Sequence, residues 1–222
     1  PRRMMNRLAT ATLVATAALA ALTSTACNIV GPAAFIIQGP PKQEAAFILP
    51  DRPTVVFVDD RKNVLPRTAL RTLIGDTAAE ELLATKTLSK TISSRDAINL
   101  ARVQETGRKP LSIDAIGEAV GAELVIYVNI ISFGASDENG MPRPTAGAEV
   151  RVIDVVNDVR LFPVDAGNPY YIQAQTDAVS PDVLRTQAGV RQVEDLLAVR
   201  LGDQVAKVFY EHERKPLGEK TG

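Results

Sequence analysis

The stretch Glu123-Leu-Val-Ile-Tyr-Val-Asn-Ile-Ile-Ser-Phe133 carries the strongest strand signal in the chain. It is almost free of charge and rich in β-branched and aromatic residues, which is typical of a buried strand. A short helix is predicted directly before it, because Ser112 is a good N-cap residue and Gly121 a good C-cap residue. A helix leading through a tight corner into a long buried strand indicates an α/β domain.

The region before this strand alternates between predicted strands and helices. The apolar run Thr54–Val58 predicts a buried strand, and Pro66 is a suitable first residue for a helix that reaches about Leu83. A short strand follows at Thr91-Ile92. Ser93 and Asp96 then match a capping box, which predicts a helix to about Gly107.

The region after this strand predicts more strands and then one helix. Strands are expected at residues 148–156, 159–162 and 170–177, with a turn at Asn157-Asp158. From Val190 to Phe209 apolar residues recur every three or four positions, which predicts one amphipathic helix from about Pro181 to Glu211. The fold class is therefore α/β: a single mixed β-sheet backed by helices, with a long C-terminal amphipathic helix.

The N-terminus is typical of a lipoprotein signal peptide, predicted over residues 1–26. Arg7 precedes the apolar run Leu8–Leu22, which is shorter than the roughly 20 residues of a membrane span. Small residues then lead to Cys27, the only cysteine. This pattern predicts cleavage between Ala26 and Cys27 and acylation of the Cys27 thiol with palmitate. Ser24 stands where a lipobox usually has Leu, so a plain signal peptide with a free thiol is the alternative.

A tether and a domain are predicted to follow the anchor. Residues 27–52 are dense in Pro and Gly, which predicts an extended, lipid-anchored tether. The α/β domain is predicted over residues 53–211, followed by a flexible tail, 212–222. The tether also contains apolar residues, at Phe35–Ile37 and Phe47–Leu49. We expect these to pack along the domain or near the lipid; a docking strand for a partner is the alternative.

The amino-acid composition limits the classes of function that this protein can have. The chain has 222 residues, 45% of them hydrophobic and 23% charged, as in folded globular proteins. Without the three arginines of the predicted signal peptide, 22 basic and 26 acidic residues remain, a net charge near −4. This balance does not favour nucleic acid as a partner. One cysteine cannot form an internal disulfide.

Candidate catalytic and ligand-binding residues are few. His212 is the only histidine, and it is expected to face solvent at the end of the last helix. Asp59-Asp60 follows the first strand and is the best candidate for metal binding or acid chemistry, although paired acids here more often cap a turn. Residues 137–140, Asp-Glu-Asn-Gly, lack the ligand pattern of a calcium loop and predict a solvated hairpin loop. No phosphate-binding glycine motif is present. We therefore predict no catalytic residue, no metal site and no cofactor.

The segment Ile116-Gly-Glu-Ala-Val-Gly-Ala-Glu-Leu-Val-Ile-Tyr-Val128 resembles a group of bacterial envelope lipoproteins. This group includes the curli secretion subunit CsgG, the penicillin-binding-protein activator LpoB and the N-terminal domain of TolB. Val150–Asp154 is similar to their next strand, and the resemblance covers roughly residues 53–211. The long hairpins from which the curli subunit builds its membrane barrel have no counterpart here, since residues 134–145 are few and polar.

The resemblance and the anchor together imply a non-enzymatic envelope protein. We expect it to be lipid-anchored to a membrane through Cys27, at the outer membrane facing the periplasm. It would bind protein partners in envelope assembly or secretion, and it could form a homo-oligomer. The alternatives are a subunit of a secretion pore and a hydrolase that uses carboxylates such as Asp59 and Asp60.

Overall fold

The computed structural model of the protein describes residues 42–104, 111–135, 142–165 and 167–213. The chain divides into two compact units, residues 44–212 and a smaller unit of residues 1–43 and 213–222. Strand β1 (Lys42–Gln43) pairs with β8 (His212–Glu213) in a separate two-stranded sheet.

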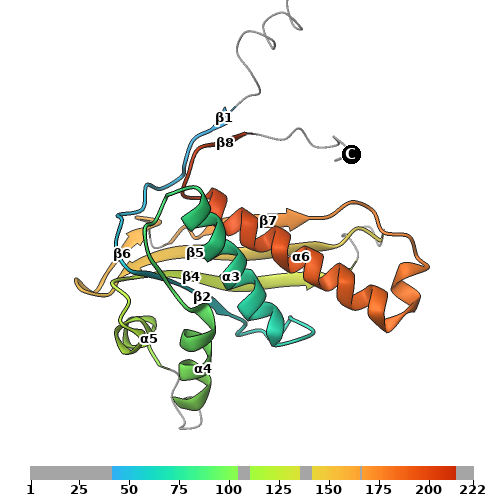
Figure 1. Cartoon of the computed structure of the whole chain (residues 1–222), viewed down its shortest axis with the longest axis horizontal. Coiled ribbons are helices and arrows are strands. Elements are labelled where there is room, and N and C mark those ends of the chain that lie inside the picture. Colours follow the sequence, from blue (N-terminus) through green and yellow to red (C-terminus); the bar gives the residue numbers. More distant parts are fainter. Residues whose placement is uncertain (1–41, 105–110, 136–141, 166, 214–222) are drawn as a thin grey trace, which may run out of the picture. The chain divides into compact units, whose positions relative to one another are not determined.

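The larger unit is built on one six-stranded mixed sheet (Figure 1). The strands run in the order β3-β2-β4-β5-β6, with β7 also paired to β5. Strand β2 is parallel to β3 and β4, whereas β5 is antiparallel to β4, β6 and β7. The predicted mixed sheet is confirmed. The bounds are β2 Thr54–Asp59, β3 Thr91–Ile92, β4 Leu124–Gly134, β5 Thr145–Asp154, β6 Val159–Phe162 and β7 Tyr170–Gln175.

Four helices back this sheet, two on each face. Helices α3 (Ala69–Ala84) and α6 (Gln187–Lys207) lie across one face, as Figure 1 shows. Helices α4 (Ser94–Gln104) and α5 (Ile113–Val120) cover part of the other. The predicted fold class is therefore confirmed. Among the described residues, no helix has the length and hydrophobicity needed to cross a membrane.

The main core lies between the sheet and the α3–α6 pair. It contains Ile74 and Leu82 of α3, Leu197 and Leu201 of α6, and the side chains that the strands turn toward them. The two helices approach closely at Gly202, where a Cβ atom would lie 2.7 Å from the carbonyl oxygen of Ile74. A larger residue at Gly202 would push the helices apart, so the sequence requires glycine at this crossing.

Helix α5 is the element whose two ends were predicted best. The Ser112 hydroxyl accepts a hydrogen bond from the Ala115 N–H, and Gly121 ends the helix with a left-handed φ of 73°. A left-handed residue at this position favours glycine because it has no Cβ. The predicted capping residue of α4 is also confirmed, since the Asp96 N–H donates to Ser93 Oγ at 3.2 Å.

The ends of the last helix differ from the prediction of Pro181–Glu211. Val183–Arg185 form a separate 3₁₀ turn, η2, and Thr186 is extended. The Thr186 hydroxyl then caps α6 by accepting from the Gly189 N–H at 3.0 Å. At the other end the Val208 carbonyl accepts from the Ala46 N–H at 2.8 Å. The N–H groups of Val208 and Phe209 donate to the carbonyls of Val205 and Ala206, so i→i+3 bonds replace the α-helical pattern and the helix ends at Lys207.

Three other elements have bounds that differ from the prediction. Helix α3 begins at Ala69 rather than Pro66, because the Arg67 carbonyl takes part in an i→i+3 turn with the Leu70 N–H. Strand β5 spans Thr145–Asp154 rather than residues 148–156, because a turn begins after Asp154. Strand β7 ends at Gln175 rather than at residue 177.

Residues 44–52, which the sequence analysis assigned to the tether, belong to the larger unit. Leu49 is buried in the main core, and Phe47 packs against the ring of Phe162 at 5.4 Å between centroids. Ile48, between them, is 83% exposed. The expectation that the tether's apolar residues pack along the domain is therefore confirmed for Phe47 and Leu49. The segment Phe35–Ile37 lies outside the described residues.

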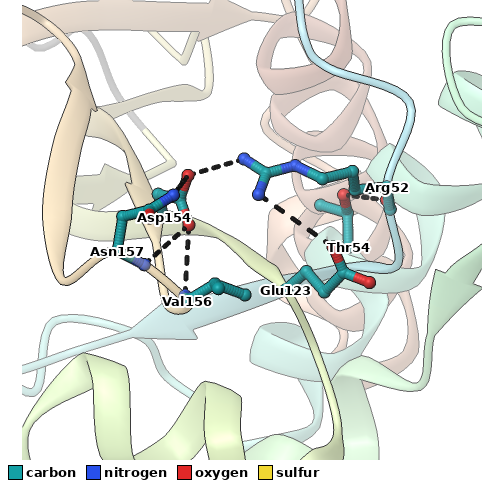
Figure 2. A network of polar contacts seen from close by, with 6 residues as sticks. All are labelled: Arg52, Thr54, Glu123, Asp154, Val156 and Asn157. Atoms are coloured by element: carbon teal, nitrogen blue, oxygen red, sulfur yellow. Dashed lines mark hydrogen bonds and ion pairs between the residues drawn. The ribbon is translucent and has the colours of Figure 1, made fainter.

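A partly buried polar network fixes this N-terminal segment to the end of β5 (Figure 2). Arg52 Nη2 donates to Asp154 Oδ2 at 2.7 Å, and the Asp154 side chain is only 5% exposed. The second Asp154 oxygen accepts from the backbone N–H groups of Val156 and Asn157, both at 3.1 Å. The hydrogen bond from Arg52 is the main cause that lowers the pKa of Asp154 from 3.8 to about 2.

Candidate functional site

The two acids at the carboxyl end of β2 have separate structural partners. Asp60 accepts backbone N–H groups with both oxygens, from Val64 at 2.9 Å and from Leu65 at 3.0 Å. The interpretation of Asp60 as a turn-capping residue is therefore confirmed. Asp59 Oδ2 instead accepts from the Tyr127 hydroxyl at 2.7 Å and from Arg61 Nε at 2.8 Å. Burial, together with this hydrogen bond, raises the pKa of Tyr127 well above its usual value.

A small cleft of about 280 Å³ lies beside these acids. Phe57 and three side chains from residues 111–116 give it an apolar wall, and Arg61 and Arg71 line its polar part. Arg71 is held in place because its Nε donates to the Val58 carbonyl at 2.9 Å. Carboxyl ends of parallel strands often form binding crevices. The lining residues of this cleft, however, contain no Ser, Cys, His or Lys side chain that could serve as a nucleophile.

The described part of the chain has no group of side chains suited to bind a metal ion. Residues 42–104, 111–135, 142–165 and 167–213 contain no group of three or more His, Cys, Asp or Glu side chains suited to a metal ion. His212 was expected at the end of the last helix, but it lies in β8, and its Nδ1 contacts the Tyr210 carbonyl oxygen at 3.1 Å. Ala26, Cys27 and residues 137–140 lie outside the described residues.

One half of the second sheet face is not covered by α4 and α5. These helices pack on the half formed by Val55, Phe57, Val125 and Tyr127. The other half carries the side chains of alternate residues of β5 and β7, which include Glu149, Arg151, Tyr171, Gln173 and Gln175. We refer to this second half, on β5 and β7, as the bare face.

The charges of the bare face are already paired. Glu149 accepts from Arg151 Nη2 at 3.2 Å and from Asn129 Nδ2 at 3.4 Å. The guanidinium groups of Arg61 and Arg151 lie over the ring of Tyr127, with their carbon atoms 5.9 and 5.8 Å from its centroid. Paired charges and cation–π contacts leave a surface that is polar but offers little net charge to a partner.

Tyr171 is the most prominent side chain of the bare face. It is 53% exposed, and its hydroxyl lies so close to Gly147 that a Cβ atom there would overlap with it. Gly147, which faces Gln173 in the ladder, therefore makes room for the tyrosine to lie across β5. This site was not predicted from the sequence, although a glycine between Ala146 and Ala148 in a strand is a signal of close approach.

Strand β7 forms one edge of the sheet, since in the described residues it pairs with β5 alone. The Thr176 N–H donates to the Pro144 carbonyl at 3.1 Å, so it points toward β5. Backbone groups alternate in direction along an antiparallel strand. Those of residues 170, 172 and 174 therefore also face β5, and the N–H and C=O groups of Tyr171, Gln173 and Gln175 face away from the sheet.

Comparison with known proteins finds solved structures that are weakly similar to this chain. No protein-family model matches the chain, and the comparison with curated proteins gives no match. Lipoprotein GNA1162 from Neisseria meningitidis is 14% identical over 63% of this chain and 94% of its own, with a TM-score of 0.35. The LpoB C-terminal domain from Escherichia coli is 18% identical over 57% and 83%, with a TM-score of 0.32. The PelC dodecamer from Paraburkholderia phytofirmans is 13% identical over 76% and 93%, with a TM-score of 0.40.

These scores are too low for any of the three likenesses to support a function. LpoB is a member of the group that the sequence resembles, and GNA1162 is a lipoprotein. The likeness to the curli secretion subunit and to TolB stays a prediction.

Proposed function

We propose that this chain is a non-enzymatic, lipid-anchored protein of the bacterial cell envelope that binds a protein partner through its bare face. The observation that carries the proposal is the half-exposed Tyr171 on an uncovered sheet face beside an open edge strand. Tyrosine offers a large, rigid contact area and is enriched at interaction hot spots. The anchor at Cys27 would hold this surface at a membrane, which we place at the outer membrane, facing the periplasm.

The carboxylate-hydrolase alternative receives less support from the geometry. Both oxygens of Asp60 are engaged by backbone N–H groups, and Asp59 is bound by Tyr127 and Arg61. A double variant, Asp59→Asn with Asp60→Asn, that folds and keeps the biological function would remove this alternative. A secretion-pore subunit remains the other alternative, and single-channel conductance in lipid bilayers would favour it.

Cross-linking in envelopes followed by purification tests the proposed function. The full chain is expressed in a bacterial host, cross-linked in intact cells and purified from detergent-solubilised membranes. We expect a specific protein partner whose yield falls with Tyr171→Ala and not with Gln192→Ala, which changes an exposed residue of α6. Loss of a tyrosine hot spot typically costs about 2 kcal/mol or more of binding free energy. Equal yields from both variants, or no enriched protein, would contradict the proposal.

A further inference from the structure

We propose that the protein partner docks by adding an extended, uncharged strand to the free edge of β7. This inference rests on the proposed function and names the mode of binding. Its first support is geometric: the backbone N–H and C=O groups of Tyr171, Gln173 and Gln175 face away from the sheet. An added strand would satisfy these groups with the same hydrogen bonds that β5 gives to the other side of β7.

The second support is a contrast between β7 and the other sheet edges. Proteins normally protect exposed edges with short strands, Pro, Lys or irregular backbone. At the opposite edge of the sheet, β3 has only two residues. Along β5, strand β6 ends at Phe162 and β7 begins at Tyr170, and the sequence between them contains Pro163 and Pro169. The six residues of β7, by contrast, contain no Pro and no charge.

The third support concerns the chemistry of the occupant. Tyr171, Gln173 and Gln175 are uncharged, and the nearest charges on the bare face, Glu149 and Arg151, are paired with each other. The side chains of β7 offer no counter-charge to a strand rich in Lys, Arg, Asp or Glu, whereas an uncharged strand loses no solvation of charged groups on docking. The occupant is therefore an uncharged segment.

A second copy of the chain fits this edge less well than a partner segment. The edge has only six residues, so two copies joined by β7 alone would share a small contact. Stable interfaces bury roughly 1,200–2,000 Å². An extended segment needs only the main-chain hydrogen bonds of the edge and the neighbouring side chains, as in other cases of strand addition.

Short peptides displayed as a random phage library are the probe for this inference. The library is selected against the full chain in detergent, and the binding of selected peptides is then measured with Gln173→Pro and Gln173→Thr. Proline removes the outward N–H at position 173 but leaves the bonds to β5 intact, and threonine keeps the N–H. We expect uncharged peptides that bind wild type and Gln173→Thr alike and bind Gln173→Pro about tenfold more weakly or worse.

N-methylated versions of the selected peptides keep the test valid even if Gln173→Pro fails to fold. Methylation of alternate residues that pair with β7 should abolish binding to the wild-type chain, whereas methylation of the intervening residues should not. Selected peptides that are charged, that tolerate every N-methylation, or that bind Gln173→Pro as tightly as wild type would overturn the inference. Failure to select any peptide would also count against it.

Two further outcomes separate the inference from the proposed function. A concentration-dependent dimer that Gln173→Pro dissociates would contradict the inference and identify a second copy as the occupant. If the peptides fail while cross-linking in envelopes still gives a Tyr171-dependent partner, strand addition is wrong and the proposed function stands. If cross-linking gives no partner, the proposed function fails whatever the peptides do.

Discussion

At the scale of single residues, the acids Asp60 and Asp154 both hold a turn by accepting backbone N–H groups. Asp60 accepts from Val64 and Leu65, and Asp154 accepts from Val156 and Asn157. The role of Asp60 could be predicted because turn-capping acids follow strands in a local pattern. The ion pair of Asp154 could not, because its partner Arg52 is 102 positions away in sequence.

The network around Asp154 predicts how stability depends on pH. The folded-state pKa of Asp154 is lowered to about 2, so its contribution is complete above its ordinary pKa of 3.8 and is lost as the pH falls toward 2. Asp154→Asn should therefore reduce the free energy of unfolding at neutral pH by about 2–4 kcal/mol and lower the melting temperature accordingly. It should also flatten the pH dependence of the melting temperature in this window. Thermal unfolding at several pH values measures both effects.

The control for this prediction is Asp158→Asn, which changes an exposed acid in the same turn. It should leave the melting temperature and its decrease below pH 4 close to those of wild type. If Asp154→Asn shows the same acid-induced loss of stability as wild type, the network is not the source of that loss.

Cys27 carries the predicted membrane anchor. In cells grown with radiolabelled palmitate, the wild-type chain should incorporate label and Cys27→Ala should not, because the thiol is the acylated group. Cys27→Ala should also leave the membrane fraction or remain unprocessed. An unlabelled wild-type chain would show that Ser24 in the lipobox position prevents acylation and that the signal peptide is of the plain type.

At the scale of elements, both ends of α5 could be predicted from local capping residues, whereas the contact that follows the end of α6 could not. Ser112 and Gly121 define α5 through side-chain and backbone preferences that are readable in sequence. Just beyond the end of α6, the Ala46 N–H donates a hydrogen bond to the Val208 carbonyl, which joins residues far apart in the sequence. Neighbouring residues contain no information about such a contact.

The apolar face of α6 predicts a clear difference between two substitutions. Leu197 is 1% exposed and packs in the main core, whereas Gln192 is exposed on the same helix. Leu197→Ala should destabilise the fold by about 2–5 kcal/mol, and Gln192→Ala should change it little. Thermal or urea unfolding of both variants measures the difference. Equal melting temperatures for Leu197→Ala and wild type would mean that α6 is not part of the core.

At the scale of the whole molecule, the sequence predicted the layers but not the surface that we assign to binding. The hydrophobic pattern of each strand and helix was sufficient for a mixed sheet backed by helices, because burial of apolar faces decides that arrangement. The bare face depends instead on which strands are neighbours and on how far α4 and α5 reach. The order of the strands, and the part of the sheet that α4 and α5 cover, depend on contacts between residues far apart in the sequence. Local patterns do not specify such contacts.

Tyr171 and β7 could not be identified as a site from the sequence, because the site also depends on long-range strand pairing. The sequence around Tyr171 has the alternating pattern of an ordinary edge strand, and nothing local shows that its other side stays open. The outward-facing backbone groups are identified by the strand pairing, in which β7 pairs with β5 alone among the described residues.

Site-specific photo-cross-linking in intact cells is the most direct measurement of the claim that a protein partner binds on this side of the sheet. A photoreactive amino acid replaces either Gln173 on β7 or Gln192 on α6 of the full chain. We expect a discrete protein adduct with the probe at position 173 and little or none at position 192. Adducts of equal yield at both positions, or an adduct at position 192 alone, would contradict it.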